Sequence, residues 1–432
     1  MEPYESRRKT FLERLDCGVA VFTSAPTTLR NNDVEHEYRQ DSDFFYLTGL
    51  DEPNCVLVLS TVHPEHRSAL FVRPRDPERE QWDGPRVGVD EAPQRLGVDV
   101  AYPIDKFAEK LPDYFQNAER LVASVGRSRA FDDKLFKALQ KTRGRWKTGV
   151  GWPTQIVDPL VILHEMRLRK DPTELQVMRR AAGITTEGHR RAMRECKPGM
   201  FEYELEAALS HTYRTRGAAR HAFPPIVASG SNATVLHYTT NGRKIEDGDL
   251  VLIDSGCEYE GYAADVTRTF PANGRFTSEQ RAIYEVVLAA QEAAIAECKP
   301  GANLDKVHEA ATGVLVDGLL ALKLLQGDRA ELLKEHHYKR FCPHRTGHWL
   351  GMDVHDVGQY FLRRVPRVIE PGMVFTVEPG LYIPPKGDQA PRQFQGIGVR
   401  IEDNVLITET GCEVLTADAP KAIEEIEAAW NA

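Results

Sequence analysis

Four acids and one histidine in the second half of the chain have side chains and positions that suit metal binding. They are Asp254, Asp265, His348, Glu378 and Glu402. Three of the acids directly follow an apolar run and Asp265 follows two alanines, so we expect all four to be buried. A buried carboxylate is expensive to desolvate without a cation, and converging carboxylates raise one another's pKa values. Bound divalent metal would resolve both problems.

The make-up of this group also indicates the kind and number of ions. Four carboxylates and one imidazole suit Mn²⁺, Co²⁺ or Zn²⁺. Four acids are more than one ion needs, so we expect a two-metal site. Two ions about 3.5–4 Å apart lower the pKa of a shared water towards ~7, and the resulting hydroxide attacks a polarised carbonyl. Amide hydrolysis is the natural reaction class, with a carboxylate of the group carrying the proton to the leaving nitrogen.

Three further histidines and one arginine lie near members of this group in the sequence and are also candidates. His344, His348 and His355 fall within twelve residues, in a segment whose proline and glycines disfavour the alternative of two histidines on a surface helix. His237 is a weaker candidate when taken alone. Arg400 alternates with Glu402, and the period of a strand puts both on one face, where the arginine could orient ligand carboxylates or form an ordinary ion pair.

The sequence predicts some of the elements that position these residues. Asp254 and Asp265 are eleven residues apart, and Gly256 and Gly261 between them favour a hairpin-like reversal. Two adjacent strands would then direct both acids to one centre. The alternative is a pair of exposed acids at strand ends, which the apolar residues before each acid disfavour.

An internal repeat runs through the second half. Helix-start signals at 171–174 and 277–280 predict helices to about 195 and about 297. Each helix ends at a Cys-Lys-Pro-Gly sequence, and these two sequences, beginning at 196 and 298, lie 102 residues apart. Residues 246–256 align with 370–380 at a spacing of 124. We infer two similar α/β halves with the metal site between them and extra residues near 324–340.

The first part of the chain predicts a separate, smaller α/β domain. Four short apolar runs read as strands and alternate with charged or helical stretches. The runs are 17–25, 55–61, 69–73 and 121–125, and the stretches between or after them include 76–95, 104–118 and 131–143. Glycines and prolines across 146–159 are typical of a linker.

Composition limits the possible classes of protein. A length of 432 residues suits two or three domains, and a formal charge of −9 argues against a general nucleic-acid binder. No apolar run is long enough to span a membrane, and the amino terminus is charged rather than a signal sequence. The seven scattered cysteines fit reduced thiols in a cytoplasmic protein.

Several stretches together resemble the M24 metallopeptidases of the pita-bread fold, and within them the aminopeptidase P group. The most specific are His237-Tyr238, residues 250–259, residues 261–271 and residues 348–358, and the similarity extends from 43–49 to 398–403. The resemblance implies an α/β (α+β) fold with two domains. An amino-terminal creatinase-like α/β domain (1–165) assists oligomer formation and access to the active site, and a pita-bread catalytic domain (166–432) has pseudo-two-fold internal symmetry.

The resemblance also implies roles for individual residues. Asp254, Asp265, His348, Glu378 and Glu402 match family ligands of two metal ions, usually Mn²⁺. Asp265 and Glu402 resemble the bridging ligands, and Glu378 the proton-handling carboxylate. His237, His344 and His355 match histidines that contact substrate or the intermediate, and Arg400 matches an arginine that supports the ligands. Trp82 matches a tryptophan that reaches a neighbour's active site in some members, with an ordinary surface tryptophan as the alternative.

The activity that the resemblance implies is release of an amino-terminal residue from peptides with proline second, by a homo-oligomer (a dimer or tetramer). Proline has no backbone N–H and a fixed φ, so a pocket shaped for its ring could select it. The main alternative is prolidase, which cleaves only Xaa-Pro dipeptides with much the same ligands. Methionine aminopeptidases usually lack the large amino-terminal domain. Non-catalytic binding modules of the same fold typically lose ligands, and none is lost here.

Overall fold

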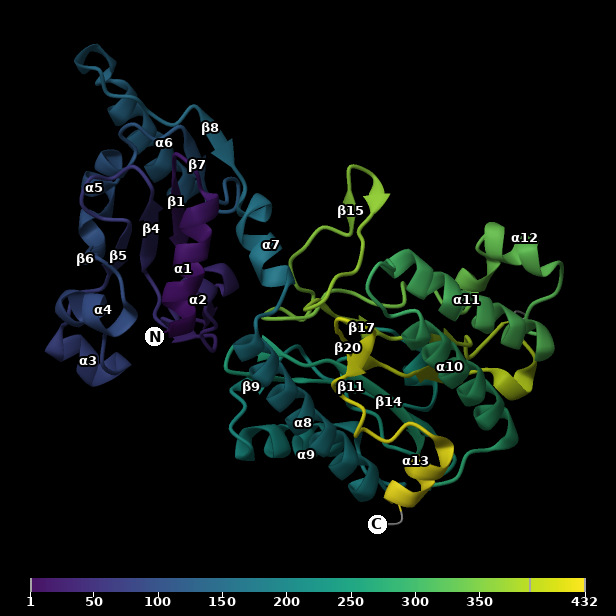
Figure 1. The fold of residues 1–432 in the computed structure, drawn as a ribbon. Coiled ribbons are helices and arrows are strands. Elements are labelled where there is room, and N and C mark those ends of the chain that lie inside the picture. Colours follow the sequence, from purple (N-terminus) through teal and green to yellow (C-terminus); the bar gives the residue numbers. More distant parts are fainter. Residues whose placement is uncertain (1, 388–389, 431–432) are drawn as a thin grey trace. The chain divides into compact units, whose positions relative to one another are not determined.

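The computed structural model describes residues 2–387 and 390–430. The chain forms two compact units, Met1–Met166 and Arg167–Ala432, and helix α7 (Leu163–Leu168) carries the chain from one to the other (Figure 1). Within the described ranges, no helix has both the length and the apolar character required to cross a membrane.

Unit 1 is built on a six-stranded mixed sheet with the order β6-β5-β4-β1-β7-β8. Its strands are β1 (Gly18–Thr23), β4 (Val56–Ser60), β5 (Ser68–Val72), β6 (Val100–Pro103), β7 (Arg120–Val122) and β8 (Gln155–Val157). Every residue of β4 and β5 is buried. Continuous burial explains why these strands appear in the sequence as unbroken apolar runs rather than as an alternating pattern.

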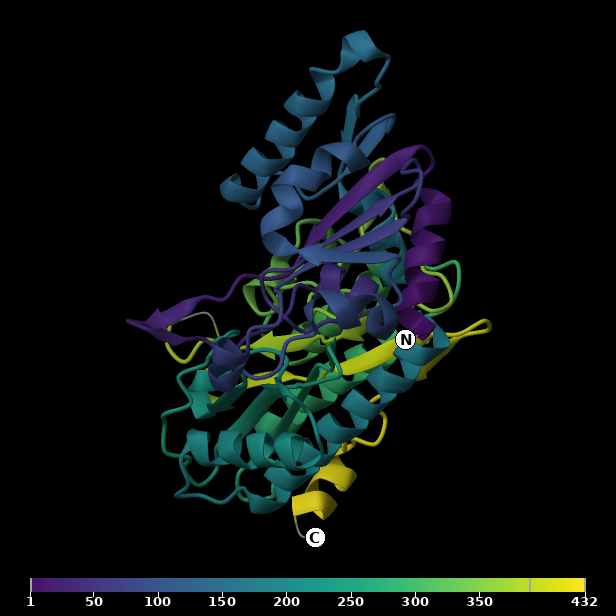
Figure 2. The same cartoon turned by 90° about the vertical axis from the view of Figure 1, so that its left-hand side faces the viewer.

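Helices cover both faces of this sheet, as Figure 2 shows. On one face, α5 (Phe107–Tyr114) and α6 (Arg129–Arg143) join a core that includes Val19 and Phe71. On the other face, Phe11 of α1 packs edge-on against Phe22 of β1. The remaining elements are α1 (Glu2–Arg14), the hairpin β2 (Leu29–Asn31) and β3 (Val34–Glu35), α2 (Ser42–Thr48), α3 (Pro77–Asp83) and α4 (Gly88–Leu96).

The prediction of a linker over 146–159 is wrong in part. Residues Gln155–Val157 form β8, which pairs in parallel with β7 at the edge of the sheet. The strand is short and its first two residues are exposed. It therefore lacks the apolar run that marks the other strands, and the glycines and prolines before it dominate the pattern.

The first half of unit 2 places two helices against a three-stranded antiparallel sheet. The helices α8 (Pro172–Glu195) and α9 (Glu202–Thr215) contact each other, and both views show this pair on one side of the strands (Figures 1 and 2). The sheet has the order β10-β11-β14, with strands β10 (Ile226–Ser229), β11 (Leu250–Ser255) and β14 (Val266–Pro271). The capping box expected at Asp171 and Glu174 is present.

The second half repeats this arrangement. Helices α10 (Ser278–Ala296) and α11 (Leu304–Ala321) contact each other, and Thr277 and Gln280 form the second capping box. The sheet has the order β17-β20-β21, from β17 (Val374–Val377), β20 (Asp403–Ile407) and β21 (Cys412–Val414), beside the pair β18 (Gly380–Tyr382) and β19 (Gly398–Arg400). The start of β17 lies 124 residues after the start of β11, at residues 250 and 374, as the sequence repeat predicts.

The two halves share one hydrophobic core, to which both helix pairs and both sheets contribute. Smaller elements surround it: β9 (Arg220–His221), β12 (Cys257–Tyr259), β13 (Tyr262–Ala263), α12 (Arg329–Lys334), η5 (His337–Arg340), β15 (Phe361–Leu362), β16 (Val365–Pro366) and α13 (Ile423–Trp430). Helix α12 and η5 occupy the stretch expected to hold extra residues. The strands of the two halves meet where the peptide N–H of Glu402 donates to the carbonyl of Thr267 (3.1 Å).

Candidate metal centre

The first two acids come from adjacent strands of the first sheet. Asp254 lies near the end of β11, opposite Thr267 of β14, and Asp265 lies directly before β14. The chain reverses through the small hairpin β12–β13, where Glu260 and Gly261 both have positive φ. The predicted reversal between the two acids is therefore present.

His348 and Glu378 come from two segments that run beside each other. The carbonyl of His348 accepts from the peptide N–H of Thr376 (2.9 Å), and the N–H of His348 is 3.2 Å from the Thr376 hydroxyl. Glu378 directly follows β17, and its N–H donates to the carbonyl of Thr346 (2.8 Å). No regular helix includes His344 or His348, as the sequence indicates.

Side-chain atoms of these segments converge. One ligand atom each of Asp265, His348 and Glu402 lies within 4.8 Å of the other two. Nε2 of His348 is 3.4 Å from Oδ2 of Asp265 and 3.7 Å from Oε1 of Glu378. Nδ1 of His348 lies 3.0 Å from the carbonyl of Trp349, which favours the tautomer that leaves Nε2 as the acceptor.

Three of the acids have an oxygen with no protein partner. Oδ1 of Asp254, Oδ1 of Asp265 and Oε1 of Glu402 are buried and make no hydrogen bond within the described protein. Buried polar atoms are rarely left in this condition unless an ion or water completes them. Carboxylate and imidazole donors suit divalent ions such as Mn²⁺ or Zn²⁺. The residues present therefore fit a metal centre.

The pKa values of the clustered acids also favour a metal centre. Burial, and then the charges of Asp254 and Glu378, raise the pKa of Asp265 well above its usual value. Burial, and then the charge of Asp265, raise the pKa of Glu402 in the same way. Burial raises the pKa of Glu378 to about 7 although His348 and Arg400 oppose the shift. A cation bound among these groups would lower the pKa values of the acids, since it favours their ionised forms.

Arg400 is hydrogen-bonded to one of the clustered acids and to two hydroxyl groups beside it. Its guanidinium donates to Oδ2 of Asp254 (2.6 Å), to the hydroxyl of Tyr382 (2.9 Å) and to that of Thr267 (3.1 Å). The Tyr382 hydroxyl also lies 2.8 Å from Nε2 of His344. Burial, followed by the nearby charge of Arg400, lowers the pKa of His344 to about 4, so that this imidazole is neutral at pH 7.

One cavity of about 750 Å³ is lined by the nine residues that the sequence predicts as metal ligands or catalytic groups. These are Asp254, Asp265, His348, Glu378, Glu402, His237, His344, His355 and Arg400. The ring of His355 meets that of His348 edge-on with 4.3 Å between centroids. His237 is exposed at the cavity wall. The remaining wall is largely apolar and includes Phe223, Pro224, Ile226 and Leu236.

Sequence reasoning missed residues that complete the site. Thr267 donates its hydroxyl to Oε2 of Glu402 (2.6 Å), and Tyr382 connects His344 to Arg400. Thr267 carries a usable signal, because it follows Asp265 by two residues at the start of a strand and so shares its face. Tyr382 lies four residues after Glu378, but a tyrosine within an apolar strand cannot be told from a core residue by its sequence.

The chain matches the models of two protein families and a known bacterial enzyme. The family model for Metallopeptidase family M24 matches residues 176–409, and the model for Aminopeptidase P, N-terminal domain matches residues 4–123. The chain is 44% identical over 429 residues to an Xaa-Pro aminopeptidase of Escherichia coli, which covers 99% of this chain and 97% of that protein.

Solved structures agree with these matches. The structure of an aminopeptidase from Pseudomonas aeruginosa superimposes with a TM-score of 0.96 at 47% identity, covering 99% of this chain and 97% of that one. A zinc-substituted aminopeptidase P of E. coli in complex with product gives a TM-score of 0.96 at 44% identity, covering 100% and 98%. The expected fold class, an amino-terminal creatinase-like domain followed by a pita-bread domain, is confirmed.

Proposed function

The chain belongs to metallopeptidase family M24, and from this premise we propose that it is a metal-dependent Xaa-Pro aminopeptidase. It hydrolyses the bond between an amino-terminal residue and a following proline, and its substrates are peptides with proline second. The observation that carries this proposal is the cavity in which four acids and a histidine converge, in a chain similar over its full length to an Xaa-Pro aminopeptidase.

Asp254, Asp265, His348, Glu378 and Glu402 are the proposed ligands of two divalent ions. The three buried oxygens without partners and the raised pKa values of the acids support this assignment. When bound, the ions supply Lewis acidity, which acidifies a water and polarises the scissile carbonyl. We propose Mn²⁺ as the physiological metal, with Zn²⁺ and Co²⁺ as the alternatives that the same donors accept.

The protein's own groups then orient the substrate and move the proton. Glu378 is proposed to carry the proton from the attacking water to the leaving proline nitrogen. His344, which is neutral at pH 7, and His355 and His237 are proposed to hydrogen-bond the substrate and the oxygen that becomes negative during attack. Arg400 holds the Asp254 carboxylate in place through its 2.6 Å contact.

Selection of proline has a physical basis in the cavity wall. The wall is apolar on the side of Phe223, Ile226 and Leu236, and such a surface accepts the proline ring without a hydrogen-bond donor. A polar or charged second side chain would be buried against this wall without a partner, and a smaller one would leave part of the wall uncovered.

Peptide length and sequence provide the central test. We expect Mn²⁺-stimulated cleavage of an Xaa-Pro-Xaa tripeptide and little cleavage of the matched Xaa-Ala-Xaa peptide. Hydrolysis of an Xaa-Pro dipeptide alone would instead identify a prolidase. No cleavage of any of these peptides by protein shown by mass spectrometry to hold two metal ions would contradict the proposal.

Substitution of the proposed ligands tests the site. Asp265→Ala and Glu402→Ala should abolish cleavage and reduce bound metal, because each removes a carboxylate that would hold the ions. The loss should exceed the ~10–100-fold typical of residues that only support ligands. Glu424→Ala, at an exposed acid of α13, is the control and should keep activity and metal content. Full activity in either ligand variant would reject the assignment.

We further propose that residues 1–165 form a domain that assists assembly of a cytoplasmic dimer or tetramer and controls access to the catalytic domain, 166–432. Large apolar side chains exposed on unit 1, such as Trp82 and Leu29, support an assembly surface. All seven cysteines are free, which supports a reducing compartment. Light scattering on the purified protein tests the assembly directly.

A further inference from the structure

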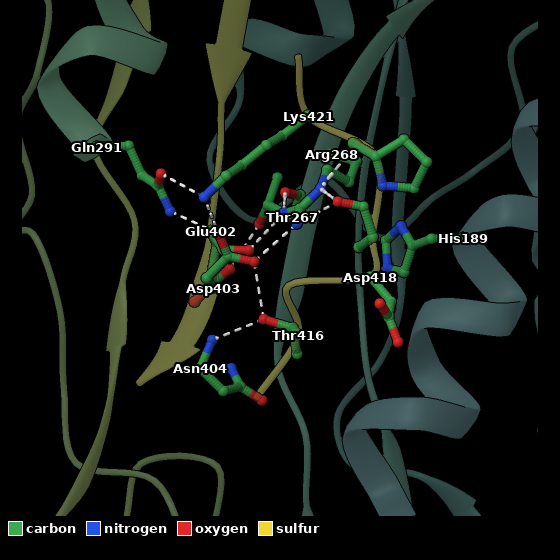
Figure 3. A network of polar contacts seen from close by, with 12 residues as sticks. His189, Thr267, Arg268, Gln291, Glu402, Asp403, Asn404, Thr416, Asp418 and Lys421 are labelled. Carbon is green, nitrogen blue, oxygen red and sulfur yellow. Dashed lines mark hydrogen bonds and ion pairs between the residues drawn. The ribbon is translucent and has the colours of Figure 1, made fainter. Parts of the chain in front are cut away.

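Asp403 follows a proposed metal ligand, but its side chain turns away from the cavity. It is fully buried. Its carboxylate accepts four hydrogen bonds of 2.7 Å, from Arg268 Nη2, Thr416 Oγ1, Gln291 Nε2 and Lys421 Nζ (Figure 3). Two cationic and two neutral donors thus use the carboxylate of Asp403, and none of them lines the cavity. Asp403 is therefore an anchor of this network and not a further metal ligand.

Arg268 connects this anchor to the backbone of the neighbouring ligand. Its Nη1 donates to the carbonyl of Glu402 (2.6 Å) and to that of Thr267 (2.9 Å). Its other nitrogens bond Asp403 and the carbonyls of Ala419 and Pro420, and its side chain is fully buried. The guanidinium thus fixes β14 and the segment 402–403 to each other (Figure 3).

Residues 402–404 connect the two proposed bridging acids: Glu402 belongs to this segment, and Asp265 is hydrogen-bonded by its last residue, Asn404. Glu402 is bonded at its N–H by the carbonyl of Thr267 and at Oε2 by the Thr267 hydroxyl. The side chain of Asn404 pairs with the backbone of Asp265, accepting from its N–H (3.2 Å) and donating to its carbonyl. The peptide N–H of Asn404 is in turn held by the Thr416 hydroxyl (3.1 Å). Asp403 lies between these two attachments.

We propose that Asp403, acting through Arg268, is a positioning residue for the metal centre. It fixes residues 402–404 so that Glu402 and Asp265 face each other at a separation that admits two ions together. A buried ion pair adds little net stability but fixes geometry, and partners behind metal ligands commonly change metal affinity ~10–100-fold. The inference rests on the proposed two-metal site.

The test is calorimetric titration of metal-free protein with MnCl₂. Wild type should bind two ions. Asp403→Asn keeps the size of the side chain but removes its charge, and should weaken at least one of the two binding steps by ~10–100-fold. At saturating Mn²⁺ its kcat should fall while its KM for an Xaa-Pro-Xaa peptide stays within about twofold, because the substrate wall is untouched.

A milder variant keeps the proposal testable if Asp403→Asn does not fold. Thr416→Val removes the hydroxyl shared by Asp403 and Asn404, and should weaken Mn²⁺ binding by a smaller factor. Thr416→Ser restores the hydroxyl and should restore the affinity. A purely structural role for the network would lower the melting temperature in both Val and Asn variants without changing either binding step.

Glu202→Gln is the matched control. Glu202 is also a fully buried carboxylate of unit 2, and it accepts from Ser229, Asn232, Tyr238 and Arg243, none of which is a proposed metal ligand. It should lower the melting temperature and leave both Mn²⁺ steps within about twofold. The inference is overturned if the Asp403 and Thr416 variants bind two ions as wild type does. Wild type that binds no metal pair would instead refute the proposed function itself.

Discussion

At the scale of single residues, the site is an acid cluster that the folded protein tolerates poorly without cations. Burial raises the pKa values of Asp265, Glu402 and Glu378, and the charges of neighbouring acids add to the shift. Each raised pKa means that the folded protein holds a proton that the unfolded chain has already released. The metal-free protein should therefore lose stability with rising pH.

This prediction concerns pH 7.5–8.5, above the titration of unfolded histidines. The acids' folded-state pKa values lie above the unfolded value of ~4, so their stabilising contribution is complete below ~4 and is lost as pH rises through the folded value. The buried histidines His189, His308 and His344 have folded-state pKa values lowered to about 4, and above pH ~7.5 they are almost wholly neutral in the unfolded chain as well, so they add little slope. In EDTA, the unfolding free energy should fall by up to about 1.4 kcal/mol per pH unit per retained proton.

Calorimetry in EDTA and in Mn²⁺ checks this expectation. Mn²⁺ should flatten the pH dependence, because the ions replace the protons. Glu402→Gln should raise the melting temperature of the metal-free protein and reduce its slope, since it removes one of the mutually repelling charges. Glu424→Gln should change neither. A metal-free wild type whose stability rises with pH over this range would contradict the account.

At the scale of elements, the site depends on backbones that approach more closely than a side chain allows. A Cβ at Gly347 would lie 1.9 Å from the carbonyl oxygen of Thr376 in β17, and a Cβ at Gly256 would lie 1.7 Å from that of Ala264. Both contacts involve backbone that cannot yield as a flexible side chain does. These glycines therefore let the segments that carry His348 and Asp265 lie directly beside their neighbours.

Gly347→Ala should destabilise the protein and displace His348. Overpacking of this kind costs about 1–3 kcal/mol, and we expect a lower melting temperature together with weaker Mn²⁺ binding. Gly183→Ala is a control with the opposite sign: Gly183 lies in α8, a Cβ there would meet nothing within 4 Å, and alanine should stabilise the helix by up to about 1 kcal/mol. Unchanged stability in Gly347→Ala would show that β17 can move aside.

Elements with strong local signals could be predicted from the sequence, and those without could not. The caps at Asp171 and Thr277 mark the starts of α8 and α10, and the helices end within a residue or so of the expected positions. Edge strand β8 has no apolar run, so its sequence predicts a linker instead. Alternation with Arg400 marks Glu402 in the sequence, but nothing local indicates the role of Asp403, because its partners Arg268, Gln291, Thr416 and Lys421 come from other segments.

At the scale of the whole molecule, unit 1 exposes several large apolar side chains to solvent. Trp82 of α3 is 86% exposed and Leu29 of β2 is 65% exposed. Exposed large aromatic side chains are typical of surfaces that meet a partner. The resemblance implies that Trp82 belongs to such a contact, near the active site of a neighbouring copy.

We expect light scattering to give a dimer or tetramer. Trp82→Ala should lower kcat/KM for an Xaa-Pro-Xaa peptide by about tenfold or more, because a tryptophan at the centre of a contact carries much of its energy. Its Mn²⁺ content should not change. Trp146→Ala, also on unit 1, should leave kcat/KM near wild type. Equal activity of the two variants would assign Trp82 to an ordinary solvent-exposed surface.

The order of the proposed ligands along the chain also has a consequence for biosynthesis. Asp254 and Asp265 belong to the first half of unit 2, and Glu378 and Glu402 to the second. A chain emerging from the ribosome thus presents its first two acids well before the last, which precedes β20, has been translated. Occupation of the proposed two-metal site must wait until residue 402 has been translated, and a premature stop before codon 402 would release a chain that lacks one of the proposed ligands.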